Sequence, residues 1–84
     1  MKLYVYSKVT SSGVDFPVVT TKLFANLEEA RAHLVKEKEK IKAKKFQGEP
    51  YYESFECEDE LDCFEAYDGP EADTAFLKIE TKNI

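Results

Sequence analysis

The chain has 84 residues, of which 43% are hydrophobic and 35% are charged, and its formal net charge is −5. This length and composition fit one folded domain over residues 1–84 and exclude a disordered chain. No apolar run approaches the roughly 18 residues of a membrane span, and the alternating segment 2–10 is unlike a signal peptide. We therefore expect a cytoplasmic protein without membrane contact, in which Cys57 and Cys63 stay reduced.

Two strands are predicted near the N-terminus. Segment 2–10 alternates in polarity and is rich in β-branched and aromatic residues, which is typical of a strand. Residues 11–13 supply a short turn, and segment 14–24 is predicted to form the second strand of the hairpin. Pro17 has no N–H to donate to a strand ladder, so this second strand is expected at a sheet edge.

A helix is predicted to begin at Asn26, whose side chain can accept a hydrogen bond from the N–H of Glu29 in the capping pattern N-x-x-E. Acidic residues fall in its first turn and lysines in its last, which suits the helix dipole. Gly48 and Pro50 are expected to end it. Its buried stripe is expected to contain Leu27, Ala30, Leu34 and Ile41, with Val35 beside them.

A period of two returns after the helix. Segments 51–57 and 61–67 predict strands joined by an acidic turn near 58–60, segment 68–73 has strong turn chemistry, and segment 74–82 predicts a last strand. Short connections favour antiparallel pairing. The predicted fold class is α+β, a five-stranded and mainly antiparallel sheet with one helix packed on one face, in the order β-β-α-β-β-β.

The two faces of this sheet have similar polarity. Leu3, Val5 and Val9 alternate with Tyr4 and Tyr6 along the first strand, yet one helix covers only one face. We expect the uncovered face to carry tyrosine and phenylalanine. An exposed aromatic patch usually marks an interface, so this face is expected to bind a second copy or another protein. The alternative is a partly solvated sheet with scattered aromatic residues.

Charge is divided unevenly along the chain. Residues 1–48 carry ten Lys/Arg and five Asp/Glu, whereas residues 49–84 carry two Lys and twelve Asp/Glu. The two halves either neutralise each other within the fold or present the hairpin 53–68 as an acidic surface to a basic partner. A third interpretation is that the carboxylates only keep the hairpin soluble and block edge-to-edge pairing. The candidate partner-binding residues are Glu56, Glu58, Asp59, Glu60, Asp62, Tyr52 and Tyr67.

Cys57 and Cys63 raise the question of a metal site or a disulfide. Structural zinc sites prefer cysteine pairs with two to four intervening residues, whereas five residues separate this pair, and His33 lies on the predicted helix. A calcium loop of the EF-hand type needs a glycine that the acidic turn lacks. The expected hairpin registers do not place the two cysteines opposite each other for a disulfide. Free thiols are favoured, and neither a metal nor a cofactor is predicted.

No catalytic constellation is recognisable in the sequence. Glycine motifs that bind phosphates or dinucleotides are missing, and His33 is expected at a boundary position, not beside a cysteine nucleophile. The lysines of 36–45 are interrupted by Glu37 and Glu39, and no aromatic residues alternate with them, which argues against nucleic-acid binding. We expect a non-catalytic protein–protein interaction module that is able to self-associate. The alternative is an acidic inhibitor or immunity-type protein that uses the hairpin 53–68 against a nucleic-acid-binding or nuclease-like partner.

Overall fold

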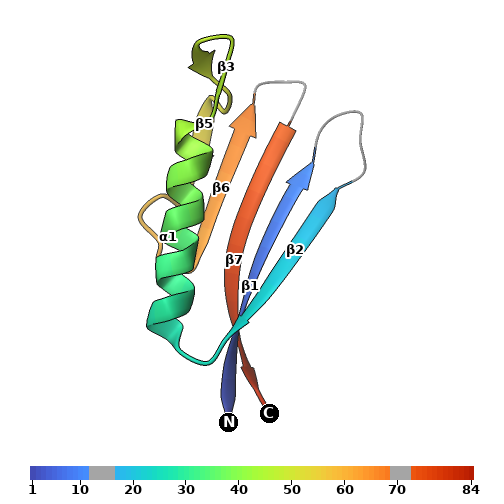
Figure 1. Cartoon of the computed structure of the whole chain (residues 1–84), viewed down its shortest axis with the longest axis vertical. Helices are drawn as coiled ribbons and strands as arrows, with labels where there is room; N and C mark the ends of the chain where they lie inside the picture. Colours follow the sequence, from blue (N-terminus) through green and yellow to red (C-terminus); the bar gives the residue numbers. More distant parts are fainter. Residues whose placement is uncertain (12–16, 69–72) are drawn as a thin grey trace.

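The computed structural model describes residues 1–11, 17–68 and 73–84. Five strands form an antiparallel sheet in the order β2-β1-β7-β6-β5, and helix α1 packs on one face of it (Figure 1). The predicted α+β fold is therefore confirmed. The elements are β1 (Lys2–Ser11), β2 (Val18–Phe24), α1 (Leu27–Ala43), β3 (Lys45–Phe46), β4 (Glu49–Pro50), β5 (Ser54–Glu56), β6 (Cys63–Asp68) and β7 (Asp73–Asn83).

The longest pairing in the sheet joins β1 to β7, the first strand to the last. Their register runs from Lys2 opposite Asn83 to Ser11 opposite Thr74. The two ends of the chain meet beside this pair, because Met1 and Ile84 exchange two backbone hydrogen bonds of 2.9 and 2.8 Å. Strand β2 lies at one edge of the sheet, as the position of Pro17 predicts, and β5 lies at the other.

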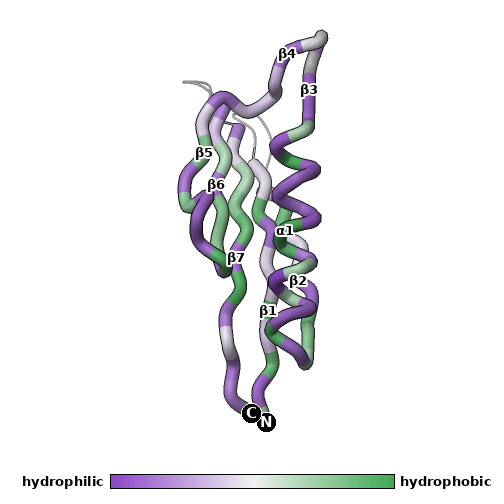
Figure 2. Tube along the Cα trace, turned by 90° about the vertical axis from the view of Figure 1, so that its left-hand side faces the viewer, coloured by the Kyte–Doolittle hydropathy of each residue, from purple (hydrophilic) through white to green (hydrophobic). Residues whose placement is uncertain are grey.

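Helix α1 begins as predicted. The side-chain oxygen of Asn26 accepts hydrogen bonds from the backbone N–H groups of Glu28 and Glu29, at 2.7 and 3.3 Å. One face of the helix packs on the sheet, as Figure 2 shows in the view turned by 90°. Val35, predicted to lie beside the buried stripe, is instead 48% exposed. The buried helical residues are Ala30, Leu34 and Ile41.

The helix ends earlier than predicted, and an unpredicted hairpin follows it. Ala43 is the last helical residue, Lys44 is extended, and β3 pairs with β4 in a second, two-stranded sheet. Gln47 and Gly48 join these two strands with φ angles of 52° and 84°. Positive φ at both central residues is typical of a type I′ turn. Gly48 therefore serves the hairpin turn and not the end of the helix.

The strand predicted for residues 51–57 is reduced to β5. The N–H of Tyr51 donates to the carbonyl of Lys44 at 2.9 Å, and Tyr52 is buried in the core. These contacts hold the chain at the end of the helix before it reaches the sheet. The predicted turns at 11–13 and 68–73, and the start of the strand predicted for 14–24, fall largely outside the described residues.

The core lies between α1 and one face of the sheet. Its largest fully buried side chains are Tyr6, Leu34, Phe64 and Leu77. Cross-strand pairing brings the three strand residues to the face that meets Leu34 of α1, because Phe64 lies opposite Leu77 and Tyr6 lies opposite Ile79. Burial of such side chains is the main stabilising contribution in a domain of this size.

The face that the helix leaves uncovered is more aliphatic than predicted. Tyr6 faces α1 and is 1% exposed, and Tyr4 packs against the same core. The expectation that the uncovered face carries tyrosine and phenylalanine is therefore wrong for β1, although it holds for Tyr67 and Phe76. We call this surface the open face; the registers place on it Leu3, Val5, Val9, Val19, Leu23, Tyr67 and Phe76.

Candidate functional site

Strand β2 is a long and largely apolar sheet edge. It contributes the sequence VVTTKLF, with one lysine as its only charge. Val18 and Val19 are each 61% exposed and Leu23 is 63% exposed. An edge strand of this kind presents unpaired N–H and C=O groups beside apolar side chains, and it is a template for pairing with another strand.

Apolar residues of the open face continue from this edge into the sheet. Val19 lies opposite Val9, Leu23 lies opposite Val5, and Val9 lies opposite Phe76. Cross-strand pairs of β-branched and aromatic residues stabilise a sheet. The polar pair of Ser7 and Thr21 lies between them, so they form two apolar patches on the open face. The edge and these two patches lie together at the β2 side of the molecule.

The opposite edge of the sheet is protected. Strand β5 has only three residues, and Glu53 precedes it. Its last residue is Glu56, and Glu58 follows in the loop. Short strands and charges at an edge discourage pairing with another chain. The two edges of the sheet therefore differ in their capacity to bind a further strand.

The acidic loop between β5 and β6 folds back onto helix α1. Lys42 forms an ion pair with Glu58 at 2.8 Å, and the Nε atom of Arg31 lies 2.8 Å from an oxygen of Asp62. Lys38 donates to the carbonyl oxygen of Glu58. The hydrogen bond from Lys42 lowers the pKa of Glu58. These pairs favour the interpretation that the basic and acidic halves of the chain neutralise each other.

The remaining predicted contact residues have different surroundings. Tyr52 is 6% exposed in the core, so its side chain is not accessible to a partner. Tyr67 lies on the open face and donates a hydrogen bond of 2.9 Å to Glu65. Glu56 and Asp59 are exposed, and no hydrogen bond or ion pair is found for their side chains within the described part of the chain. The predicted set is therefore not a single surface.

Glu60 differs from the other carboxylates of the loop because it accepts a hydrogen bond from a thiol. The Cys63 thiol donates to Glu60 at 2.7 Å, and the Cys57 thiol donates to Glu65 at 3.4 Å. The hydrogen bond to Glu60, together with burial, raises the pKa of Cys63 to about 12. The hydrogen bond with Cys63 lowers the pKa of Cys57, but burial and the bond to Glu65 outweigh it, so the pKa of Cys57 is raised as well. Both thiols are free and half-buried.

Such thiols are not activated nucleophiles, since a catalytic cysteine needs a lowered pKa. His33, the only histidine of the chain, does not adjoin them. It packs edge-on against Tyr6, with ring centroids 4.5 Å apart, and against Phe24 at 5.5 Å. A cysteine–histidine pair is therefore not formed.

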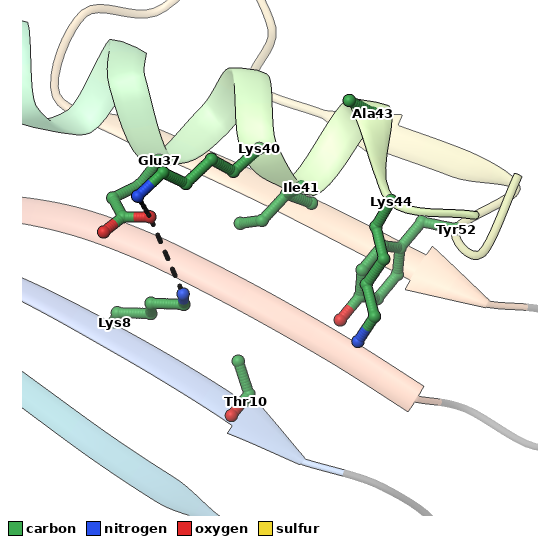
Figure 3. A pocket seen from close by; sticks show the side chains of 8 residues that line it. All are labelled: Lys8, Thr10, Glu37, Lys40, Ile41, Ala43, Lys44 and Tyr52. Atoms are coloured by element: carbon green, nitrogen blue, oxygen red, sulfur yellow. Dashed lines mark ion pairs between the residues drawn. The ribbon is translucent and has the colours of Figure 1, made fainter. Parts of the chain in front are cut away.

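A cavity of about 440 Å³ lies between the C-terminal half of α1 and strand β1 (Figure 3). Figure 3 shows Lys8 and Lys40 directed toward the carboxylate of Glu37, at 3.8 and 4.0 Å. Lys44 lies over the ring of Tyr51, 4.1 Å from its centroid. The carboxylate of Glu37 is thus held by two lysines. The residues that line the cavity contain no acid–base pair free to act on a substrate.

Comparison with known proteins finds no matching family model, no matching curated protein and no matching solved structure. Among the residues that the structure describes, no helix has both the length and the apolar character needed to cross a membrane.

Proposed function

We propose that this chain is a non-catalytic protein–protein interaction module that pairs through the edge of β2, and that its partner is a second copy of the chain. The observation that carries this proposal is the exposure of Val18, Val19 and Leu23 along an edge strand with a single charged residue. Backbone hydrogen bonds across two β2 strands would satisfy the free edge of each copy.

A symmetric pairing is supported by the difference between the two sheet edges. Two β2 strands that pair antiparallel extend each sheet across the twofold axis, and the open face then continues from one copy to the other. Val19 and Leu23 of the two copies can then pack against each other across the new strand pair, and Val5 and Val9 lie next to them on β1. The charged β5 edge remains at the outer ends, where it prevents further addition of strands.

The acidic-inhibitor alternative has weaker support. Glu58 and Asp62 are engaged by Lys42 and Arg31 of the same chain, so a basic partner would have to displace these contacts. Reversing their charges would also disturb the fold of the loop. A cleaner probe of this alternative is Asp59→Lys, because Asp59 is exposed and its side chain forms no hydrogen bond or ion pair within the described residues.

The experiment that tests strand pairing is light scattering after size-exclusion chromatography over a series of protein concentrations. We expect a mass that rises from 9.7 kDa towards twice that value. Val19→Lys should keep the chain monomeric, because lysine on an edge strand opposes pairing. Val35→Lys is the matched control, since it places the same charge on the exposed side of α1. A monomer at every concentration, or equal effects of both variants, would show that β2 does not pair.

A further inference from the structure

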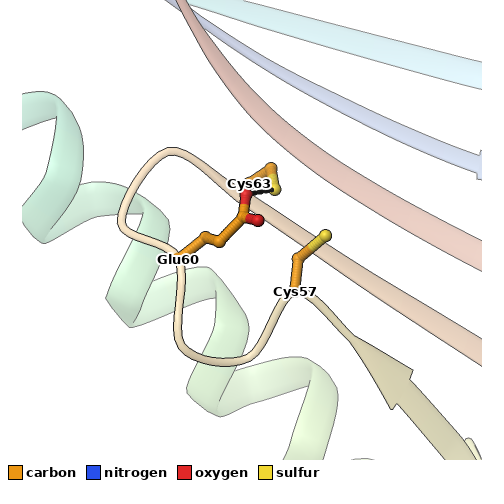
Figure 4. Close-up of side chains that lie close together, drawn as sticks. All are labelled: Cys57, Glu60 and Cys63. Atoms are coloured by element: carbon orange, nitrogen blue, oxygen red, sulfur yellow. Dashed lines mark hydrogen bonds between the residues drawn. The ribbon is translucent and has the colours of Figure 1, made fainter.

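Three potential metal ligands meet at the loop that joins β5 to β6, at the edge of the sheet opposite β2. Cys57, Glu60 and Cys63 offer two sulfur atoms and a carboxylate oxygen, all within 4.8 Å of one another. Figure 4 shows their side chains gathered on one side of the loop, from the end of β5, the middle of the loop and the start of β6. The spacing C-x2-E-x2-C is the sequence signature of this cluster.

The backbone bends to bring these groups together. Cys57 has a φ of 59°, in the left-handed region where a side chain costs about 1–2 kcal/mol relative to glycine. The N–H of Glu60 donates to the carbonyl of Cys57 at 3.1 Å, which closes a tight turn. A cysteine at a position that glycine occupies without strain indicates that its side chain has a role there.

The loop is held on both sides of the cluster. Glu58 follows Cys57 and is paired with Lys42, while Asp62 precedes Cys63 and is paired with Arg31. These contacts fix the loop on the helix without using the three ligands. Ligands that are positioned before the metal arrives bind it with less loss of conformational freedom.

Glu65 on β6 adjoins the cluster at Cys57, outside the group of three residues whose ligand atoms all lie within 4.8 Å of one another. The Cys57 thiol donates to Oε2 of Glu65, and the hydroxyl of Tyr67 donates to Oε1 of the same carboxylate at 2.9 Å. Tyr67 thereby orients Glu65, as hydrogen-bond partners commonly orient metal-binding carboxylates. Cys63 and Glu65 lie on the same face of β6, because they are two residues apart on one strand.

We propose that Cys57, Glu60 and Cys63 form a binding site for a zinc-class divalent cation, with Glu65 as the fourth ligand. Two sulfurs and two carboxylate oxygens favour zinc over calcium or magnesium, which prefer oxygen ligands alone. A tetrahedral zinc ion with Zn–S bonds of about 2.3 Å places its two sulfurs about 3.8 Å apart, which small side-chain shifts within the cluster provide. Binding forms two metal–sulfur bonds and releases both thiol protons to solvent.

The test uses the whole reduced chain, freed of metal by a chelator, and Co²⁺ as a spectroscopic probe that Zn²⁺ then displaces. We expect one Co²⁺ per chain, with thiolate-to-cobalt charge-transfer absorption and visible bands of tetrahedral intensity. Cys57→Ser and Cys63→Ser should remove the charge-transfer absorption and weaken Zn²⁺ binding by at least about 100-fold, and Glu60→Gln should weaken it by about tenfold. Asp59→Asn, which changes the neighbouring carboxylate, should leave the affinity within about twofold of the unchanged chain.

Thiol alkylation of the unchanged chain supplies a readout that does not depend on the folding of any variant. Bound Zn²⁺ should protect Cys57 and Cys63 together. Absence of charge-transfer absorption, loss of protection, or equal effects of Asp59→Asn and Glu60→Gln would each overturn the site. One metal per two chains would also overturn it, because the ion would then be held by cysteines of two copies. Repeating the titration on Val19→Lys separates this result from strand pairing at β2.

Discussion

Arg31 on α1 and Asp62 in the loop before β6 form a two-point ion pair across 31 residues of sequence. The Nε atom of Arg31 lies 2.8 Å from Oδ1 of Asp62, and Nη2 lies 3.4 Å from Oδ2. The hydrogen bond from Arg31 to Asp62 raises the pKa of the guanidinium. Because both side chains are partly exposed, solvent and salt screen this pair, and its main effect is to position the loop.

Removing this pair should loosen the loop more than it destabilises the domain. For Arg31→Gln we expect faster hydrogen exchange at the amide of Glu60, whose bond to Cys57 closes the turn, with little change in the exchange of core amides. Arg31→Lys should retain part of the protection, since lysine keeps the charge but not the two-point geometry. Uniformly faster exchange across the sheet would instead assign the pair a role in global stability.

His33 should make stability depend on pH. Burial against Tyr6 and Phe24 is the main cause of its lowered pKa; Lys22, Lys36 and Lys40 lower it further, while Glu37 opposes the shift. In the unfolded chain the histidine has a pKa of about 6.5, so near this pH the unfolded chain binds more protons than the folded chain. The free energy of unfolding therefore falls as the pH drops through this value.

We expect the urea midpoint to decrease between pH 7 and pH 5.5 in the unchanged chain and to change less in His33→Gln. This window lies above the range in which most carboxylates titrate. Direct NMR titration of the single histidine provides an independent measurement. A pKa at or above about 6.5 for His33 in the folded state would contradict the expected sign.

Tyr6 carries a buried hydroxyl that has no hydrogen-bond partner among the described residues. Such a group costs about 1–3 kcal/mol of folding free energy, because it loses its contacts with water. Tyr6→Phe keeps the ring against His33 and removes the hydroxyl, so the free energy of unfolding should rise by about 1 kcal/mol. Tyr67→Phe is the control, since the hydroxyl of Tyr67 is bonded to Glu65 and its removal should not stabilise. A destabilised Tyr6→Phe would show that the hydroxyl is hydrogen-bonded in solution.

In the turn between β3 and β4, substitutions at two neighbouring positions should change the free energy of unfolding in opposite directions. Gly48 has a φ of 84° and open space around its α-carbon, so Gly48→Ala should destabilise by about 1 kcal/mol through the backbone alone. Gln47 has a φ of 52° with a side chain attached, so Gln47→Asn should stabilise by a few tenths of a kcal/mol, since asparagine tolerates this region better. Equilibrium unfolding in urea measures both, and effects of equal sign would exclude the type I′ conformation.

The fold was predictable from the sequence because its signals are local. Alternation of polar and apolar residues marks the strands. Asn26 marks the start of the helix, where its side chain accepts hydrogen bonds from two backbone N–H groups. The hairpin β3–β4 was missed because two-residue strands carry no periodic pattern. The available signal was Gly48 directly after Gln47, since a glycine at the second position suits a two-residue hairpin turn. Which face of β1 is buried was not predictable, since Tyr6 and Val5 differ little in polarity and the packing of α1 decides between them.

The candidate sites were less predictable, because they depend on contacts between distant segments. The unequal charge of the two halves indicated mutual neutralisation as one possibility, but not that Arg31 and Lys42 select Asp62 and Glu58. The cysteine cluster depends on the left-handed backbone at Cys57, which no spacing rule reveals. The available signal in the sequence was Glu60, a possible metal ligand midway between the two cysteines.

The pairing of β1 with β7 also constrains how the protein is made. The ribosome produces β1 first, yet its longest partner strand is β7, whose register with it reaches from Ser11 opposite Thr74 to Lys2 opposite Asn83. Until β7 leaves the exit tunnel, β1 is paired only with β2, and the apolar side of α1 lacks its main cover. Core closure therefore follows translation of the last strand, and contacts this distant in sequence slow folding. A nascent chain stalled before β7 has left the tunnel should remain sensitive to protease, whereas one extended at its C-terminus until β7 is outside the tunnel should become resistant.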